Sequence, residues 1–409
     1  MSANNTLAGP NGTNALLRKH VDQLQRVGLS YDEAMLVAAR RVAAAGARSG
    51  PGNPAEFAVV FALALVAALA VKLPELIGGP AWVAASWLFL RNVGFFVLPF
   101  LAGYFVWKRQ PGGRAIALLA AGFAVAAVFA NAYPFAARSD TVRLTALHLP
   151  VALWLLVGMA HAGGAWGQNA RRMDFVRFSG ELLIYYVLIA IGGGVFIALN
   201  LGIFQAIGID AEKAVELLLP CGMAGAVIVA AWLVETKQRV MENMAPVLTQ
   251  IFTPLFAVAL LVFLGAMAWT GRGIDVERNA LIVFDLLLAL VLALLLYSIS
   301  ARDPKAPPAA IDRVLVVLLV SALLADAFAL AAIVARISEL GFTPNRTATL
   351  GFNLILLANL AWAAVLHVRF VRGGGTFASV ERWQTAYLPV YSAWAALVVV
   401  AFPPLFGFR

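Results

Sequence analysis

Charged residues are scarce in this sequence. They make up 12% of its 409 residues, about half of the roughly 25% that is typical of soluble domains. Hydrophobic residues make up 62%, and the mean hydropathy is +0.86. This composition excludes a soluble enzyme, a secreted disulfide-bonded domain and a disordered protein. We expect an all-α integral membrane protein rather than a barrel, because the apolar stretches are continuous and not alternating.

Residues that carry redox, metal or hydrolytic chemistry are also few. Cys221 is the only cysteine, which excludes an intrachain disulfide. Two of the four histidines, His148 and His161, share one predicted span, but they lie about 20 Å apart along a helix and cannot bind the same metal. Walker A, His-Glu-x-x-His and Gly-x-Ser-x-Gly motifs are absent. We therefore predict no metal and no cofactor, and we find no support for catalysis.

The N-terminal part of the chain is polar and differs from the rest. We expect residues 1–12 to be disordered, residues 13–48 to form a hairpin of two helices, and residues 49–54 to be a linker. Ser30 and Glu33 form a capping box that opens the second helix. The hairpin carries six basic residues, which are Arg18, Lys19, Arg26, Arg40, Arg41 and Arg48.

This basic hairpin has two interpretations. It could be a helix-turn-helix that binds DNA, or a small cytoplasmic domain whose charges help to hold the N-terminus inside the cell. We favour the second, because two short helices lack the core of a DNA-binding domain. We accordingly predict no nucleic-acid partner, and we expect any cytoplasmic protein partner to bind the hairpin.

Residues 55–409 are predicted to form a bundle of about eleven transmembrane helices, since a span takes about twenty residues at a rise of 1.5 Å each. The spans are placed at about 57–77, 81–107, 114–133, 143–161, 178–202, 214–234, 246–270, 279–300, 312–335, 348–368 and 385–407. With the N-terminus inside, 20 Lys and Arg residues lie inside, 8 outside and 2 within spans, which accounts for all 30. The positive-inside rule then predicts an internal N-terminus and, after an odd number of spans, an external C-terminus.

Six polar residues inside the predicted spans form the candidate intramembrane site. They are Lys72, Arg91, Asp285, Asp326, Asn353 and Asn359. Charged groups in spans are costly and often mark functional sites. Most of these lie in the outer half of the bilayer, so the acids and bases could form ion pairs around a polar cavity open to the outside. Alternatively, they could be structural ion pairs that hold helices together. Glu181 and Glu235, near inner ends of spans, are expected to be solvated or to pair with loop arginines.

The run Gly192-Gly193-Gly194 interrupts the fifth predicted span. It could be an unwound segment that exposes its backbone to a substrate, as in discontinuous transporter helices. It could also allow close helix packing, since Ala190, Gly194 and Ala198 have the spacing of a small-residue interface. We favour packing.

Several motifs cluster in the last hundred residues. They are Arg336-Ile-Ser-Glu339-Leu-Gly341-Phe-Thr343-Pro344-Asn345-Arg346, Gly351-Phe-Asn353-Leu, Asn359-Leu-Ala-Trp362, Leu388-Pro389-Val-Tyr391-Ser-Ala-Trp394 and Phe402-Pro403. Together they resemble a bacterial multi-pass membrane family catalogued as domain of unknown function 4153. The resemblance implies a helical fold in the inner membrane, and it implies no activity, substrate or catalytic residue. The run Gly-Leu-Ser-Tyr-Asp-Glu-Ala at 28–34 resembles the prefix segment before some bacterial permease domains.

The first of these motifs is also a candidate external loop. Its polar members are Arg336, Glu339, Thr343, Asn345 and Arg346. Gly341 and Pro344 predict a tight turn, in which Glu339 can pair with either arginine and Asn345 can cap the next span. This loop could gate or recognise a solute near Asp326, or it could be only a well-formed turn.

These features favour a transporter or permease-like protein of the bacterial inner membrane, with the lipid bilayer as its surroundings and an unidentified solute or lipid as its substrate. One alternative is a non-transporting sensor or assembly subunit that acts through the hairpin. Another is an enzyme on a lipid-linked substrate, with the outer acids as general acid or base. Uptake by reconstituted vesicles would separate the first from the other two.

Overall fold

The computed structural model describes residues 54–79, 88–136, 139–206, 212–236, 244–270 and 278–409, together with positions 21, 31 and 35. Throughout these residues the regular structure is helical, which confirms the predicted all-α class. The predicted segments 1–12, 13–48 and 49–54 lie outside the described residues, apart from Pro54 and those three positions. Contacts group residues 62–409 into one compact unit, which holds the helix bundle, and residues 1–61 into another.

The helices follow one another along the chain with short connections. They are α3 (Pro54–Gly78), α5 (Leu88–Asn92), the 3-10 helix η1 (Val93–Phe96), α6 (Leu98–Arg109), α7 (Gly113–Ala132), α8 (Asp140–His161), α9 (Asn169–Ala206), α10 (Glu212–Thr236), α12 (Met244–Thr270), α13 (Arg278–Ala301), α14 (Ala310–Leu340), α15 (Pro344–Val371) and α16 (Phe377–Leu405). Their order matches the order of the predicted spans.

Ten helices in the described part of the chain are long and apolar enough to cross a membrane. The multi-pass membrane class predicted from composition is therefore supported. The difference from the eleven predicted spans lies at α13, whose described apolar part, Asp285–Ala301, is shorter than the others. The second predicted span, 81–107, is divided in the structure into α5, η1 and α6. Pro99 lies in the first turn of α6, where its missing N–H costs nothing.

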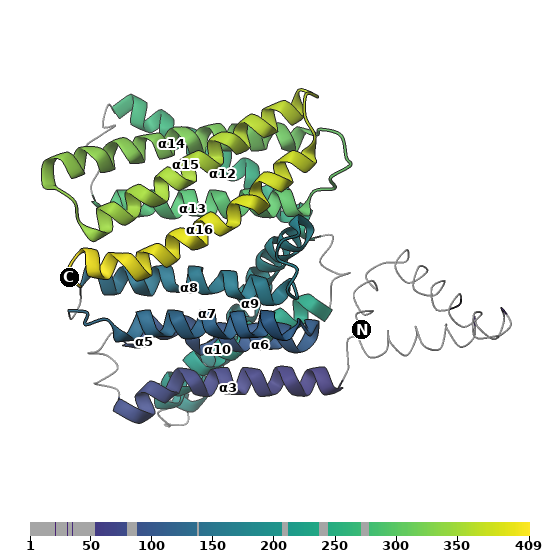
Figure 1. Ribbon diagram of the computed structural model, residues 1–409, viewed down its shortest axis with the longest axis vertical. Coiled ribbons are helices and arrows are strands. Elements are labelled where there is room, and N and C mark those ends of the chain that lie inside the picture. The colour runs from purple at the N-terminus through teal and green to yellow at the C-terminus, as the bar shows by residue number, and fades with distance from the viewer. Residues whose placement is uncertain are drawn as a thin grey trace. The chain divides into compact units, whose positions relative to one another are not determined.

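Helix α16 connects two groups of helices within the bundle. It packs against α15 on one side and against α8 on the other, as Figure 1 shows for the yellow helix. Helix α14 packs against α12, α13 and α15, while α8 packs against α6 and α7, and α9 packs against α10 and α13. The outward side chains of α9 are large and apolar, including Leu188, Phe196 and Leu199. Exposed apolar surface of this extent suits lipid and not water.

The buried face of α14 explains the position of Asp326. Ala322, Asp326, Ala329 and Ile333 follow a spacing of three or four residues, so they share one helix face. All four are buried, and the alanines allow the neighbouring helices to approach closely. The apolar periodicity of α14 thus carries Asp326 into the core of the bundle.

The glycine run of α9 differs from both interpretations of the sequence. Residues 192–194 are helical within a continuous helix, so the backbone is not unwound. They are exposed, and no described atom lies within 4 Å of a Cβ placed at any of the three. Close packing against a described helix therefore does not account for them either.

Candidate functional site

Asp326 is the most unusual polar residue in the described core. Its side chain is fully buried on α14, with 0% exposure, and neither carboxyl oxygen has a hydrogen-bond partner. An ionised carboxylate in such a place would cost several kcal/mol. A proton, a bound cation or hydration of the carboxyl group would remove this cost.

The charged group that acts on Asp326 is another acid. Asp285 on α13 is close enough to interact with it electrostatically. Asp285 has a hydrogen bond of its own, since Asn353 Nδ2 donates to its Oδ1 at 2.9 Å. Two ionised carboxylates near each other repel, so ionising both would cost more than ionising either one alone.

Amide and phenol groups on α15 and α16 extend the arrangement. Asn359 Nδ2 donates to Gln384 Oε1 at 3.1 Å and to Tyr391 Oη at 2.8 Å. Tyr391 also interacts electrostatically with Asp326. Oδ1 of Asn359 and Oδ1 of Asn353 have no hydrogen-bond partner although both side chains are fully buried. The core therefore contains several oxygen atoms with free lone pairs.

We call this group the α13–α16 polar cluster. Its members are Asp285, Asp326, Asn353, Asn359, Gln384 and Tyr391. Of the six predicted site residues, Asn353 is hydrogen-bonded to Asp285, and Asn359 is hydrogen-bonded to Tyr391. Asp326 lies within electrostatic range of Asp285 and Tyr391, without a hydrogen bond to either. Gln384 and Tyr391 were not predicted as site residues, although Tyr391 lies within a motif of the last span. The sequence does not indicate that these two residues lie near the acids, because that proximity arises only when α15 and α16 pack into the bundle.

The two predicted basic members of the site have other partners. Lys72 Nζ lies 2.7 Å from Glu75 Oε2, one turn further along α3. The guanidinium of Arg91 lies over the ring of Phe135, 5.3 Å from its centroid, which is within the range of a cation–π contact. The structure thus pairs neither base with the acids of the α13–α16 polar cluster.

The turn between α14 and α15 forms as the sequence predicts, but with different capping. Gly341 has φ of 73°, a left-handed conformation that favours glycine. The N-cap of α15 is Thr343, whose Oγ1 accepts from the N–H of Arg346 at 3.3 Å, whereas Asn345 lies inside the helix. Arg346 Nη1 donates to the carbonyl oxygens of Leu340 and Gly341 at 3.0 and 2.9 Å. These bonds close the turn, and Arg336 and Glu339 lie on the last turns of α14.

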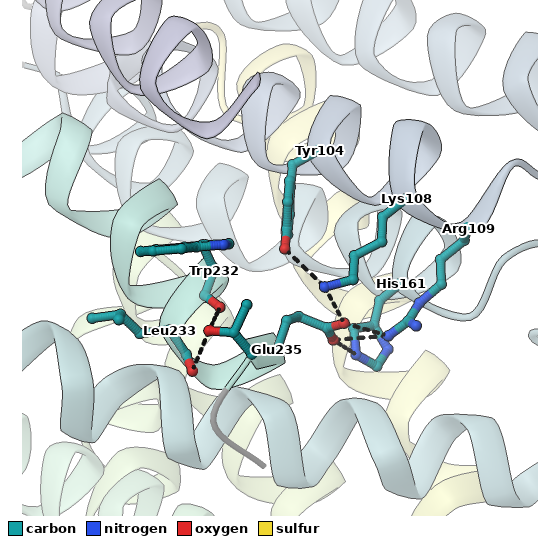
Figure 2. A network of polar contacts seen from close by, with 8 residues as sticks. Tyr104, Lys108, Arg109, His161, Trp232, Leu233 and Glu235 are labelled. Carbon is teal, nitrogen blue, oxygen red and sulfur yellow. Dashed lines mark hydrogen bonds and ion pairs between the residues drawn. The ribbon is translucent and has the colours of Figure 1, made fainter. Parts of the chain in front are cut away.

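A cluster that sequence reasoning only partly anticipated surrounds Glu235 at the C-terminal end of α10 (Figure 2). Arg109 Nη2 lies 2.8 Å from Oε1 and 2.9 Å from Oε2 of Glu235. Lys108 Nζ lies 3.3 Å from Oε2, and His161 Nε2 lies 3.5 Å from Oε1. Pairing with a loop arginine was one of the two predicted environments for Glu235. Glu181 was also expected to be either solvated or paired with a loop arginine, and its side chain is buried.

The Glu235 cluster joins the C-terminal ends of three helices. Arg109 ends α6, His161 ends α8 and Glu235 precedes the last residue of α10. The His161 ring also packs against Phe105 and Phe178, with centroids 4.9 and 4.8 Å away. The ends of these three helices therefore lie on one side of the bundle.

A second ion pair joins α13 to α14. Arg302 Nε and Nη2 donate to the two carboxyl oxygens of Asp312 at 2.8 and 3.1 Å. The guanidinium lies over the rings of Phe370 and Phe377, with distances of 4.7 and 4.5 Å to their centroids. Asp312 also accepts from the N–H of Ala309 at 2.7 Å and so caps α14. This bidentate pair has all its partners and is structural.

No three His, Cys, Asp or Glu side chains are grouped within the described residues in a way that could hold a metal ion. Comparisons with protein-family models, with curated proteins and with solved structures find no match for this chain. The described residues support a multi-pass membrane protein built of helices, with a buried acid, Asp326, that has no hydrogen-bond partner among them.

Proposed function

We propose that the chain is a secondary transporter in which Asp326 carries a coupling proton. The observation that supports this proposal is the fully buried carboxyl group of Asp326, whose two oxygens have no hydrogen-bond partner. A structural acid would have a base or several donors around it, as Asp312 does. A proton neutralises Asp326 without a set of ligands, and intramembrane acids without a base commonly act as proton sites.

The depth of the two acids is consistent with this role. Asp285 lies 16 residues before the end of α13, and Asp326 lies 16 residues after the start of α14. At 1.5 Å per residue, each is about 24 Å from the helix ends that Arg302 and Asp312 join. In a hydrocarbon core of about 30 Å, this places both acids nearer to the opposite face. A proton would then enter the cluster from that face.

We also propose the orientation that the charge count predicts, with the N-terminus inside and the C-terminus outside in a bacterial inner membrane. The ends of α8 support opposite sides for the C-terminus and the Glu235 cluster. Thr141 N, at the start of α8, donates to the carbonyl of Arg409 at 3.1 Å, whereas His161 at its end belongs to the Glu235 cluster. The 22 residues of α8 separate the two by about 33 Å.

The resemblance to the family of domain of unknown function 4153, and of the N-terminal run to a permease prefix, fits the same proposal. A permease with a cytoplasmic prefix would place residues 13–48 inside, as the charge distribution predicts. The candidate external loop at 336–346 would then lie on the side from which protons enter.

The first test asks whether Asp326 holds a proton. Infrared spectra of the purified protein in lipid should contain the carbonyl band of a protonated carboxyl group at neutral pH. Asp326→Asn should remove that band, because the amide has no carboxyl proton. Asp140→Asn is the matched control, since this acid is partly exposed with its side chain near Arg143, and it should leave the band unchanged. A spectrum without the band in the parent protein would exclude the proton role.

The second test asks whether the proton is coupled to transport. Liposomes containing the protein, under an imposed pH gradient, are screened for uptake of amino acids, sugars, nucleosides and fluorescent lipids. We expect one class to accumulate only under the gradient, and Asp326→Asn to reduce that accumulation to the level of empty liposomes. Uptake unchanged by Asp326→Asn would contradict the proposal. No uptake of any class, with a cytoplasmic protein captured by the hairpin, would favour the sensor or assembly subunit.

A further inference from the structure

A large apolar cavity is lined by none of the members of the α13–α16 polar cluster. Its volume is about 610 Å³, which is within the range of roughly 300–1,000 Å³ that is usual for small-molecule sites. Residues of η1, α6, α8, α9, α10, α13 and α16 line it. Four of the lining residues are Val97, Gly180, Val227 and Ala293. All of these helices belong to the apolar segments of the bundle, and η1 lies within the segment Leu88–Arg109. The cavity therefore lies at membrane depth.

The break in the second span creates part of this space. Val93, Gly94 and Val97 lie in and next to η1, and all three line the cavity. A Cβ placed on Gly94 would lie 3.2 Å from Cδ1 of Leu153, so the glycine lets η1 pass close to α8. A continuous α-helix at this point would direct these side chains differently, because a 3-10 turn has three residues per turn and not 3.6.

Few polar groups reach the cavity, and two of them are already paired. Trp154 Nε1 donates to Ser179 Oγ at 3.2 Å, and Ser179 Oγ donates to the carbonyl of Phe175 at 2.8 Å. Of the remaining lining residues, only Tyr186 and Tyr297 carry a polar side-chain group. Such a lining cannot solvate a charged or sugar-like solute, which needs many donors and acceptors. It suits a hydrocarbon chain.

Tyr297 contributes its ring to the cavity wall. Its Oη is buried, with no hydrogen-bond partner among the described residues. The ring fits only because residue 180 is glycine, since a Cβ there would overlap the Tyr297 ring. This part of the wall therefore offers an occupant apolar surface and no accessible donor.

The cavity also reaches the lipid-facing surface. Leu183 lines it and is 60% exposed on the outside of α9. Apolar cavities of this kind exclude water, whereas the hydrocarbon chains of the bilayer are adjacent at high concentration. We propose that this cavity binds one acyl chain of a membrane phospholipid. This inference does not depend on the proposed transport activity.

The test uses the full chain reconstituted in vesicles that contain a phospholipid with a photoreactive diazirine in one acyl chain. After illumination, labelled residues are identified by mass spectrometry. We expect labelling of Trp154 and Val176, which line the cavity from α8 and α9. Val227→Phe and Ala293→Phe fill the cavity from α10 and α13 and should each reduce this labelling at least about tenfold. Val125→Phe, at a position 54% exposed on α7, is the matched control and should leave it unchanged.

If label appears only on outer residues such as Phe196, or if both filling variants are labelled like the parent, the chain does not enter the cavity.

Discussion

Glu235 and Asp326 are buried acids with opposite surroundings. Glu235 has Arg109 and Lys108 within ion-pair distance at the ends of α6 and α10, whereas Asp326 lies mid-helix beside another acid. A buried charge that keeps its partners can be tolerated, and removing one partner leaves the other uncompensated. The two residues should therefore respond differently to neutralisation.

Glu235→Gln should destabilise the protein by about 3 kcal/mol, because it leaves two cations without their common carboxylate. The change is measured as the free energy of unfolding in mixed detergent micelles. Combining it with Arg109→Gln should recover part of the loss. Glu75→Gln is the matched control: its side chain is 40% exposed beside Lys72, so the loss should stay below about 1 kcal/mol. Equal losses from both changes would show that the Glu235 cluster has no special role.

Glycines of the helices illustrate how one residue type serves two purposes. In α9, Gly192, Gly193 and Gly194 are exposed with open space around them. In α15, Gly351 lies against Trp394 of α16, and a Cβ at this position would overlap the indole ring. The first group weakens its helix without a packing benefit among the described residues, and the second allows two helices to approach.

Gly193→Ala should leave the melting temperature of the purified protein unchanged or raise it, because alanine favours a helix by about 0.5–1 kcal/mol over glycine. Gly351→Ala should lower it, with an overpacking cost of about 1–3 kcal/mol. Both variants are compared by thermal unfolding in the same detergent. A loss of stability for Gly193→Ala would mean that this part of α9 is packed against another molecule or must unwind.

For the whole molecule, the decisive property is which face of the membrane each end occupies. Phe408 and Arg409 accept hydrogen bonds at the start of α8, where the carbonyl of Phe408 meets the N–H of Ala136 at 3.0 Å. The opposite end of α8 lies in the Glu235 cluster with Lys108 and Arg109. Since basic residues concentrate on the inner face, the C-terminus is expected outside.

A reporter that is active only in the periplasm should give a signal when fused after Arg409, and one that is active only in the cytoplasm should do so when fused before Phe57. Both fusions are scored by reporter activity in intact cells. A cytoplasmic C-terminus would mean that the number of spans is even. The helix assignments would then have to be tested one by one with reporters fused in successive loops.

The sequence alone determined the helical membrane class and the approximate positions of the spans. These depend on local properties, namely the length and hydropathy of each segment, which a helix in lipid keeps regardless of its neighbours. The same holds for the turn at Gly341. The 3-10 break at η1 and the exposure of the α9 glycines were not predicted, because both depend on how the neighbouring helices are arranged.

Only the tertiary structure decided which polar groups meet. Asp285, Asn353 and Tyr391 are far apart in the chain, and their contacts arise because α13, α15 and α16 pack around α14. Lys72 and Arg91 have suitable charges for the acids, but Lys72 pairs within its own helix and Arg91 lies over Phe135. The physical reason is range: hydropathy acts on each segment separately, whereas hydrogen bonds and ion pairs act over a few ångströms between side chains that packing must first bring together.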